Sequence, residues 1–196
     1  IIKEIKAVNL ESCPIISNDS LLLFATSWPC SLFAYKNYDS LYSELIGFDD
    51  HTTPVIDNQN NLYIFSEPDL IKINSTGEML WSVNLNVGTL SASLNMDKAG
   101  NIYLIGDDYS IKSISNDGVL NWSYNENRLM KNTFHSPAFS PDGNTIYLQG
   151  ETVSLIAFDI NTKTIKWEFG NTALKSGPIV DSDGNCYIIP SNQGFD

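Results

Sequence analysis

Two histidines and one arginine are the first residues of this chain to consider as metal ligands or catalytic groups. His51 and His135 each come just before an expected strand, where a side chain could face the mouth of a channel. Zinc takes three or four protein ligands, so two histidines without a third make no zinc site. Arg128 lies in an expected loop. No spacing groups Ser, His and Asp, or Cys and His, as a nucleophilic site. We therefore predict no catalytic, cofactor-binding or metal-binding residue, and keep His51 and His135 as channel or partner candidates.

Aspartate-rich segments are the second feature that could bind a ligand. Residues 181–185, Asp-Ser-Asp-Gly-Asn, resemble a calcium loop in composition. They lack the distal glutamate of an EF-hand, and they take the place of a hairpin turn in an internal repeat of the chain. We interpret them as a plain turn. Asp49-Asp50 and Asp107-Asp108 are interpreted in the same way, as solvated loops.

Composition and charge limit the partners. Lys and Arg total 11 against 23 Asp and Glu, which gives a formal net charge of −12. Such a surface repels phosphate backbones and the sequence has no basic cluster, so no nucleic acid is expected. No stretch approaches the ~20 apolar residues of a membrane span. The chain begins at Ile1 without Met or a signal peptide, and we interpret it as a processed or trimmed piece.

The elements that would position these residues are set by an internal repeat of about 40 residues. Four segments open alike and a fifth keeps the phase without proline, with successive spacings of 40, 39, 44 and 41 residues. These openings are Cys13-Pro14-Ile15-Ile16, Thr53-Pro54-Val55-Ile56, Ala92-Ser93-Leu94-Asn95, Ser136-Pro137-Ala138-Phe139 and Gly177-Pro178-Ile179-Val180. A polar turn comes after each, and then a strand with a tyrosine in fixed phase, as in Leu62-Tyr63-Ile64.

A third strand, another turn and a fourth strand complete each repeat. The fourth strand carries a tryptophan, namely Trp81, Trp122 or Trp167. One four-stranded meander cannot cover both of its faces, so neighbouring copies must stack to bury a shared core. The tryptophans offer large flat surfaces for this stacking, and we predict that they dock adjacent sheets.

The predicted fold is all-β: a β-propeller segment of four-stranded antiparallel blades over residues 1–196. We expect complete blades at about 12–47, 52–86, 91–128 and 135–170, a partial blade at 176–196, and a lone strand from Ile2 to Val8. A parent ring would hold about seven or eight blades at ~40 residues each. Missing blades or an edge-completing partner would then protect the open edge.

The first repeat departs from the others. Tyr42 takes the tryptophan phase, whereas Trp28 falls in a loop between the second and third strands. An exposed tryptophan can anchor a partner, or it can pack under its loop, so Trp28 is a candidate for partner contact. Cys13 and Cys30 would lie near one end of this blade, where a single bridge is possible. Cys186 replaces the Ile or Leu of other repeats and is expected in the core.

The third turn and fourth strand carry a family resemblance. Residues 157–167 resemble the tryptophan-docking motif A-x-D-x-x-T-G-K-x-x-W of the pyrroloquinoline-quinone (PQQ)-like repeat. Ala157, Asp159, Thr162 and Trp167 match, while Lys163 replaces the glycine of the motif and Thr164 its lysine. The family includes PQQ-dependent alcohol and glucose dehydrogenases, an outer-membrane assembly lipoprotein and many non-catalytic surface propellers.

Three functions are compatible with this resemblance. The leading hypothesis is a non-catalytic, extracytoplasmic propeller that binds a protein or small ligand. A PQQ- and calcium-dependent dehydrogenase is the alternative, although no position of this sequence matches the family's catalytic residues. A structural module of a larger surface protein is the third.

Overall fold

The computed structural model describes residues 14–18, 20–27, 30–36, 39–45, 53–88, 90, 93–129 and 135–191. The chain forms two compact units, residues 1–89 and residues 90–196. Every regular element in the described ranges is a β-strand, so the all-β prediction is confirmed. No helix long and apolar enough to cross a bilayer occurs in this part of the chain.

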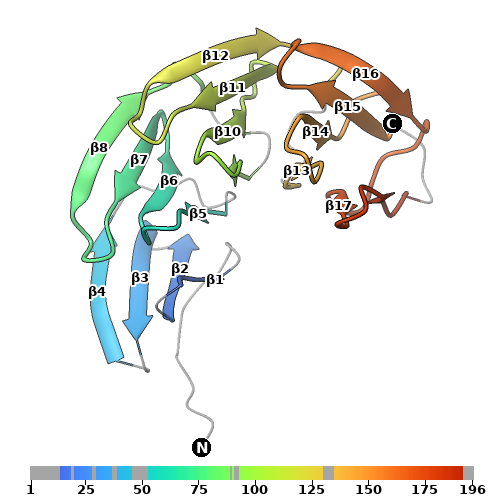
Figure 1. The fold of residues 1–196 in the computed structure, drawn as a ribbon. Coiled ribbons are helices and arrows are strands. Elements are labelled where there is room, and N and C mark those ends of the chain that lie inside the picture. Colours follow the sequence, from blue (N-terminus) through green and yellow to red (C-terminus); the bar gives the residue numbers. More distant parts are fainter. Residues whose placement is uncertain are drawn as a thin grey trace, which may run out of the picture. The chain divides into compact units, whose positions relative to one another are not determined.

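The strands form four-stranded antiparallel sheets in chain order, as predicted (Figure 1). In the first unit, one sheet contains β1 (Ile15–Ile16), β2 (Leu21–Ser27), β3 (Cys30–Lys36) and β4 (Asp39–Leu45), and the other contains β5 (Val55–Ile56), β6 (Leu62–Ser66), β7 (Asp69–Ile73) and β8 (Met79–Asn84). In the second unit, the sheets are β9 (Asn95–Met96), β10 (Ile102–Ile105), β11 (Ser110–Ile114) and β12 (Leu120–Asn125), then β13 (Ala138–Phe139), β14 (Thr145–Leu148), β15 (Leu155–Asp159) and β16 (Thr164–Phe169), and the pair β17 (Ile179–Val180) and β18 (Cys186–Tyr187).

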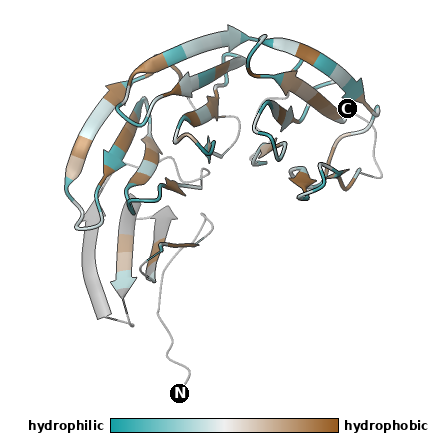
Figure 2. Cartoon of the chain, viewed as in Figure 1, coloured by the Kyte–Doolittle hydropathy of each residue, from teal (hydrophilic) through white to brown (hydrophobic). Residues whose placement is uncertain are grey.

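Burial within each sheet explains the sequence pattern. The second and third strands of the three sheets β5–β8, β9–β12 and β13–β16 are covered on both faces, and β15 is hydrophobic almost throughout (brown in Figure 2). The fourth strands β8 and β12 alternate instead, because one face looks toward a neighbour and the other toward water. In these three sheets with a tryptophan, a β-bulge interrupts the pairing of the third and fourth strands. The bulge lies next to the residue pair that contains the tryptophan. Tyr42, opposite Ala34, holds the same register position in the first sheet.

Hydrophobic clusters join neighbouring sheets inside each unit. In the first unit, Leu23 and Ala34 of one sheet pack with Leu62, Ile64 and Ile71 of the next. In the second unit, a larger cluster joins β10 and β11 to β14 and β15. Each sheet in these pairs therefore gains its buried face from its neighbour, as the repeat predicts.

A repeated aspartate turn precedes the second strand of three sheets. The carboxylate of Asp97 accepts hydrogen bonds from the backbone N–H groups of Ala99 and Asn101, from the Asn101 side chain and from the Tyr103 hydroxyl. Asp57 and Asp181 make the same four bonds to the residues two, four and six positions later. The tyrosine in fixed phase therefore donates to the turn in all three sheets, and Tyr63 and Tyr103 are core residues as well.

This turn shifts the pKa of Tyr103 and that of Asp181. Burial and the negative charge of Asp97 raise the pKa of Tyr103 to about 12. Hydrogen bonds from Asn185 and Tyr187 lower the pKa of Asp181 to about 2. Because the carboxylate of Asp181 is satisfied by its own turn, the segment 181–185 is a hairpin turn as predicted.

Candidate binding sites

The apolar surface around Trp167 is the first candidate site. We call it the Trp167 face, and its members enclose a cavity of about 420 Å³. They are Leu155, Trp167, Phe169, Cys186, Tyr187 and Ile188. The fourth strand β16 supplies Trp167 and Phe169, and β18 supplies Cys186 and Tyr187.

Three large side chains of this face are open to solvent. Trp167 is 42% exposed, Phe169 60% and Tyr187 57%. The Trp167 ring lies 5.7 Å from the ring of Tyr147 in its own sheet. Exposed aromatic and apolar groups gathered in this way are typical of an interaction surface.

Cys186 lies at the edge of this cavity. It is partly buried against the cluster of Tyr147, Leu155 and Ala157, in agreement with the expected core position. Burial raises the pKa of its thiol, so the thiolate is scarce at neutral pH.

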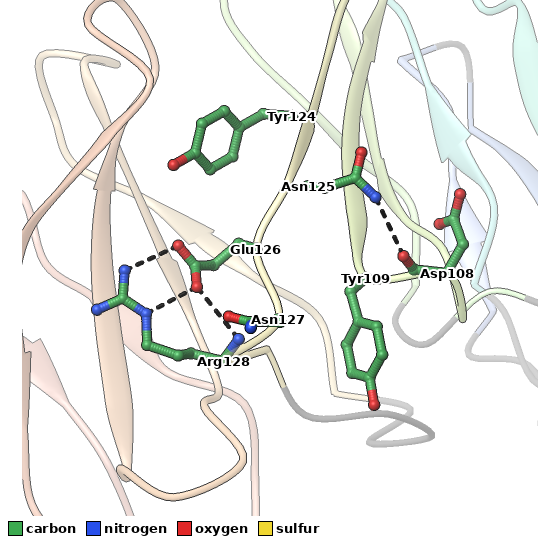
Figure 3. A pocket seen from close by; sticks show the side chains of 7 residues that line it. All are labelled: Asp108, Tyr109, Tyr124, Asn125, Glu126, Asn127 and Arg128. Atoms are coloured by element: carbon green, nitrogen blue, oxygen red, sulfur yellow. Dashed lines mark hydrogen bonds and ion pairs between the residues drawn. The ribbon is translucent and has the colours of Figure 1, made fainter.

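A polar pocket of about 590 Å³ is the second candidate site (Figure 3). We call it the Arg128 pocket. It is lined by Asp108, Tyr109, Tyr124, Asn125, Glu126, Asn127 and Arg128. Figure 3 shows Glu126 and Arg128 facing one another on one side and Asp108 and Tyr109 on the other.

Arg128 is held by two carboxylates. Its Nε and Nη2 donate to the two oxygens of Glu126 at 2.7 and 2.9 Å, and its Nη1 donates to Glu168 of β16 at 2.7 Å. The Glu126 carboxyl is buried, and the hydrogen bonds from Arg128 lower its pKa. The arginine therefore links the loop after β12 to the next sheet and fixes the wall of the pocket. We call this arginine with its two carboxylates the Arg128 fork. The sequence predicts the loop position of Arg128 but not the fork, because the second carboxylate lies 40 residues away.

The predicted docking tryptophans each contact the tyrosine of their own sheet. Trp81 lies 5.9 Å from Tyr63, and Trp122 lies 5.9 Å from Tyr103 and 6.3 Å from Phe158 of the next sheet. Trp122 thus contacts two sheets, whereas Trp167 has an exposed side. Whether all three dock adjacent blades stays a prediction.

The other candidates are only partly described. His135 shares a 2.7 Å hydrogen bond between its Nδ1 and Oε1 of Gln149. Among the described residues, no three His, Cys, Asp or Glu side chains gather closely enough to hold a metal ion. Trp28, His51, Cys13 and the strand expected at 2–8 lie outside the described residues, as does the side chain of Cys30. The channel, partner and disulfide interpretations of these residues stay predictions.

The repeated sheets and their shared clusters define the chain as a β-propeller protein. A family model described as outer membrane protein assembly factor BamB matches residues 47–193, and the chain belongs to this PQQ-like family. The predicted family is thereby confirmed. No curated protein matches the chain by sequence.

Solved structures agree on the fold. BamB from Moraxella catarrhalis is similar with a TM-score of 0.69 and 12% identity, over 91% of this chain and 60% of that one. A streptogramin B lyase has a TM-score of 0.71 and 12% identity, over 94% of this chain and 64% of that one. Virginiamycin B lyase from Staphylococcus aureus has a TM-score of 0.70 and 12% identity, over 93% and 66%. The chain thus spans less than two thirds of the length of each of these structures.

Proposed function

We propose that this chain is a non-catalytic propeller scaffold that binds protein, and that the Trp167 face is its binding surface. The observation that carries the proposal is the exposure of Trp167, Phe169 and Tyr187 around one cavity. Large aromatic side chains of this kind are the usual anchors of protein interfaces. The family description as an assembly factor of outer membrane proteins supports a protein-binding role and an extracytoplasmic location.

The preceding sheet indicates which ligand would fit. At Trp122, the side chains that cover the equivalent surface come from the third strand and the adjoining turn of the next sheet. Phe158 lies 6.3 Å from the Trp122 ring, and the Lys163 ammonium lies 5.5 Å from its centroid. We infer that the Trp167 face takes a β-hairpin that adds to the edge of β18 and places an apolar side chain over Trp167.

The other candidate functions have less support. A dehydrogenase would need about six to eight oxygen ligands around calcium and a basic side chain turned to the quinone. In the described part of the chain, Arg128 is engaged by Glu126 and Glu168, and acidic side chains do not gather as a metal site. The dehydrogenase therefore stays the alternative proposal. A structural module would use the same surface for a permanent contact.

A synthetic hairpin tests the proposal. Residues 153–169 form the strands β15 and β16 that cover Trp122, and a peptide of this sequence with W167F would serve as the probe. Cys186 reports occupancy, because alkylation of its thiol by iodoacetamide can be followed by peptide mass spectrometry. We expect saturating peptide to slow alkylation of Cys186 by about fivefold or more. A scrambled peptide should have no effect.

Two variants give the matched controls. Trp167→Ala should abolish the protection, whereas Val119→Ala, at an exposed apolar residue of another sheet, should preserve it. Protection that grows with protein concentration in the absence of peptide would point to a second copy of the chain as the occupant. Equal alkylation with and without the hairpin, in a correctly folded protein, would contradict the proposal.

A further inference from the structure

The Arg128 pocket contains one residue, Glu126, whose type differs from that at the corresponding position of another repeat. Glu126 and Leu85 hold corresponding positions, each four residues after the tryptophan of its sheet. Each donates its backbone N–H to the hairpin between the second and third strands, Leu85 to Pro68 and Glu126 to Tyr109. Both side chains are buried, Leu85 at 7% and Glu126 at 4% exposure. One copy of the repeat thus fills this place with an apolar side chain, so the fold itself does not require the charged pair.

The charged groups of the pocket are already compensated. Arg128 is bound by Glu126 and Glu168, and Asp108 lies 3.6 Å from the Lys112 ammonium. A strongly charged ligand would have to compete with these pairs. The pocket therefore favours a ligand without net charge.

Neutral hydrogen-bonding groups remain available. The Tyr124 hydroxyl and the Asn127 amide make no hydrogen bond to other described residues. Each of these groups both donates and accepts, and the guanidinium of Arg128 keeps two N–H donors beyond its three bonds to carboxylates. A ligand rich in hydroxyl groups, which also donate and accept, complements this set.

The walls of the pocket are held in place before any ligand arrives. The Tyr124 ring lies 5.1 Å from the ring of Phe158, and Asn125 donates to the backbone carbonyl of Asp108 at 3.2 Å. Tyr109 has a φ of 62°, and its backbone is fixed by hydrogen bonds with Gly106 and Glu126. Fixed polar groups lose little entropy on binding. Tyrosine rings add flat apolar surfaces on which the C–H face of a sugar can lie.

We propose that the Arg128 pocket binds a neutral saccharide, with the Tyr124 hydroxyl, the Asn127 amide and the Arg128 guanidinium as its hydrogen-bonding groups. The volume of about 590 Å³ lies within the roughly 300–1,000 Å³ of small-molecule sites. Its open, polar character points to binding in the millimolar range. This site is separate from the Trp167 face and does not depend on the protein-binding role proposed for it.

Ligand-observed NMR on the full chain tests the site. The probes are glucose, N-acetylglucosamine and maltose, each up to ~50 mM, a range that covers weak polar binding. We expect saturation transfer to at least one of them. Tyr124→Phe keeps the ring against Phe158 and removes only the hydroxyl, and we expect it to weaken binding about fivefold. Asn127→Ala should do the same.

The controls distinguish binding at the Arg128 pocket from nonspecific binding elsewhere on the protein. Asn171→Ala changes the residue that corresponds to Glu126 in the next sheet, outside the pocket, and should leave binding unchanged. Circular dichroism and the urea midpoint should match those of the parent chain for all three variants. The proposal would be overturned if none of the probes received saturation transfer from the protein. It would also be overturned if the transfer were unaffected by Tyr124→Phe and Asn127→Ala. Tighter binding of trilysine than of any saccharide would show that the pocket takes cations instead.

Discussion

The surfaces at Trp122 and at Trp167 have the same sequence phase and different surroundings. Trp122 lies between Tyr103 and Phe158, and Lys163 approaches its ring. Trp167 has Tyr147 on one side, and β16, unlike β12, leaves the tryptophan and the aromatic residue two positions later exposed. The repeat therefore supplies one half of the Trp122 junction through its own tyrosine. The third strand and the adjoining turn of the next sheet supply the other half, through Phe158 and Lys163.

The largest expected effect separates the two surfaces by stability. Phe158 is fully buried at the covered junction, and Phe158→Ala should lower the free energy of unfolding by about 3–5 kcal/mol, since it leaves a cavity beside Trp122 and Tyr124. Phe169→Ala on the Trp167 face should cost less than about 0.5 kcal/mol. Urea unfolding of the two variants measures both values. Equal losses would mean that the Trp167 face is covered.

The aspartate turns at Asp97 and Asp181 should also differ in how much they contribute to the free energy of unfolding. Asp97→Ala removes the acceptor of four hydrogen bonds, including that of buried Tyr103, and should cost about 2–3 kcal/mol. Asp181→Ala should cost clearly less, because Tyr187 is exposed and water can replace its partner. Thermal or urea unfolding checks the order. A larger loss at Asp181 would contradict the difference in burial between the two sheets.

Removing the ion pairs of Arg128, which link the sheet of Trp122 to the next sheet, should have a smaller effect on the free energy of unfolding. Glu126→Leu installs the residue type found at Leu85 and should cost about 1 kcal/mol, because Arg128 is half exposed and keeps Glu168. Adding Arg128→Ala should recover part of that loss, since no guanidinium then lies beside the leucine, and the exposed carboxylate of Glu168 is left to water. A double-mutant cycle measures the coupling. Additive losses would show that the fork does not stabilise the junction.

The smallest expected effect is that of acid on two aspartate turns, at Asp142 and at Asp181. The pKa of Asp142 is lowered to about 2 by hydrogen bonds from Ser140 and Asn144, and that of Asp181 to about 2 by its own turn. A carboxyl whose pKa is lower in the folded state contributes stability above its unfolded pKa of about 4 and loses it as the pH falls toward 2. The urea midpoint of Asp181→Asn should therefore fall less over this range than that of the parent chain.

Most of the fold could be predicted from the sequence because it is local and repeated. The alternation of turns, tyrosine and tryptophan depends on neighbours within one sheet, and it predicted the order of the strands and the turn at 181–185. The two candidate binding surfaces depend on residues from different sheets. Glu168 completes the Arg128 fork from 40 residues away, and the exposure of Trp167 depends on the residues that pack beside β18. No pattern within a single repeat carries this information.

The most direct test of the account compares the two tryptophans in solution. Two variants would keep only Trp122 or only Trp167, with the other tryptophans replaced by phenylalanine, and acrylamide quenching would be measured with and without the 153–169 hairpin carrying W167F. We predict that Trp167 emits at longer wavelength and is quenched about two- to threefold more strongly than Trp122, and that the hairpin brings its quenching close to that of Trp122. Equal quenching of the two residues, or no change of Trp167 with the hairpin, would contradict the claim that this face is open and takes an added β-hairpin.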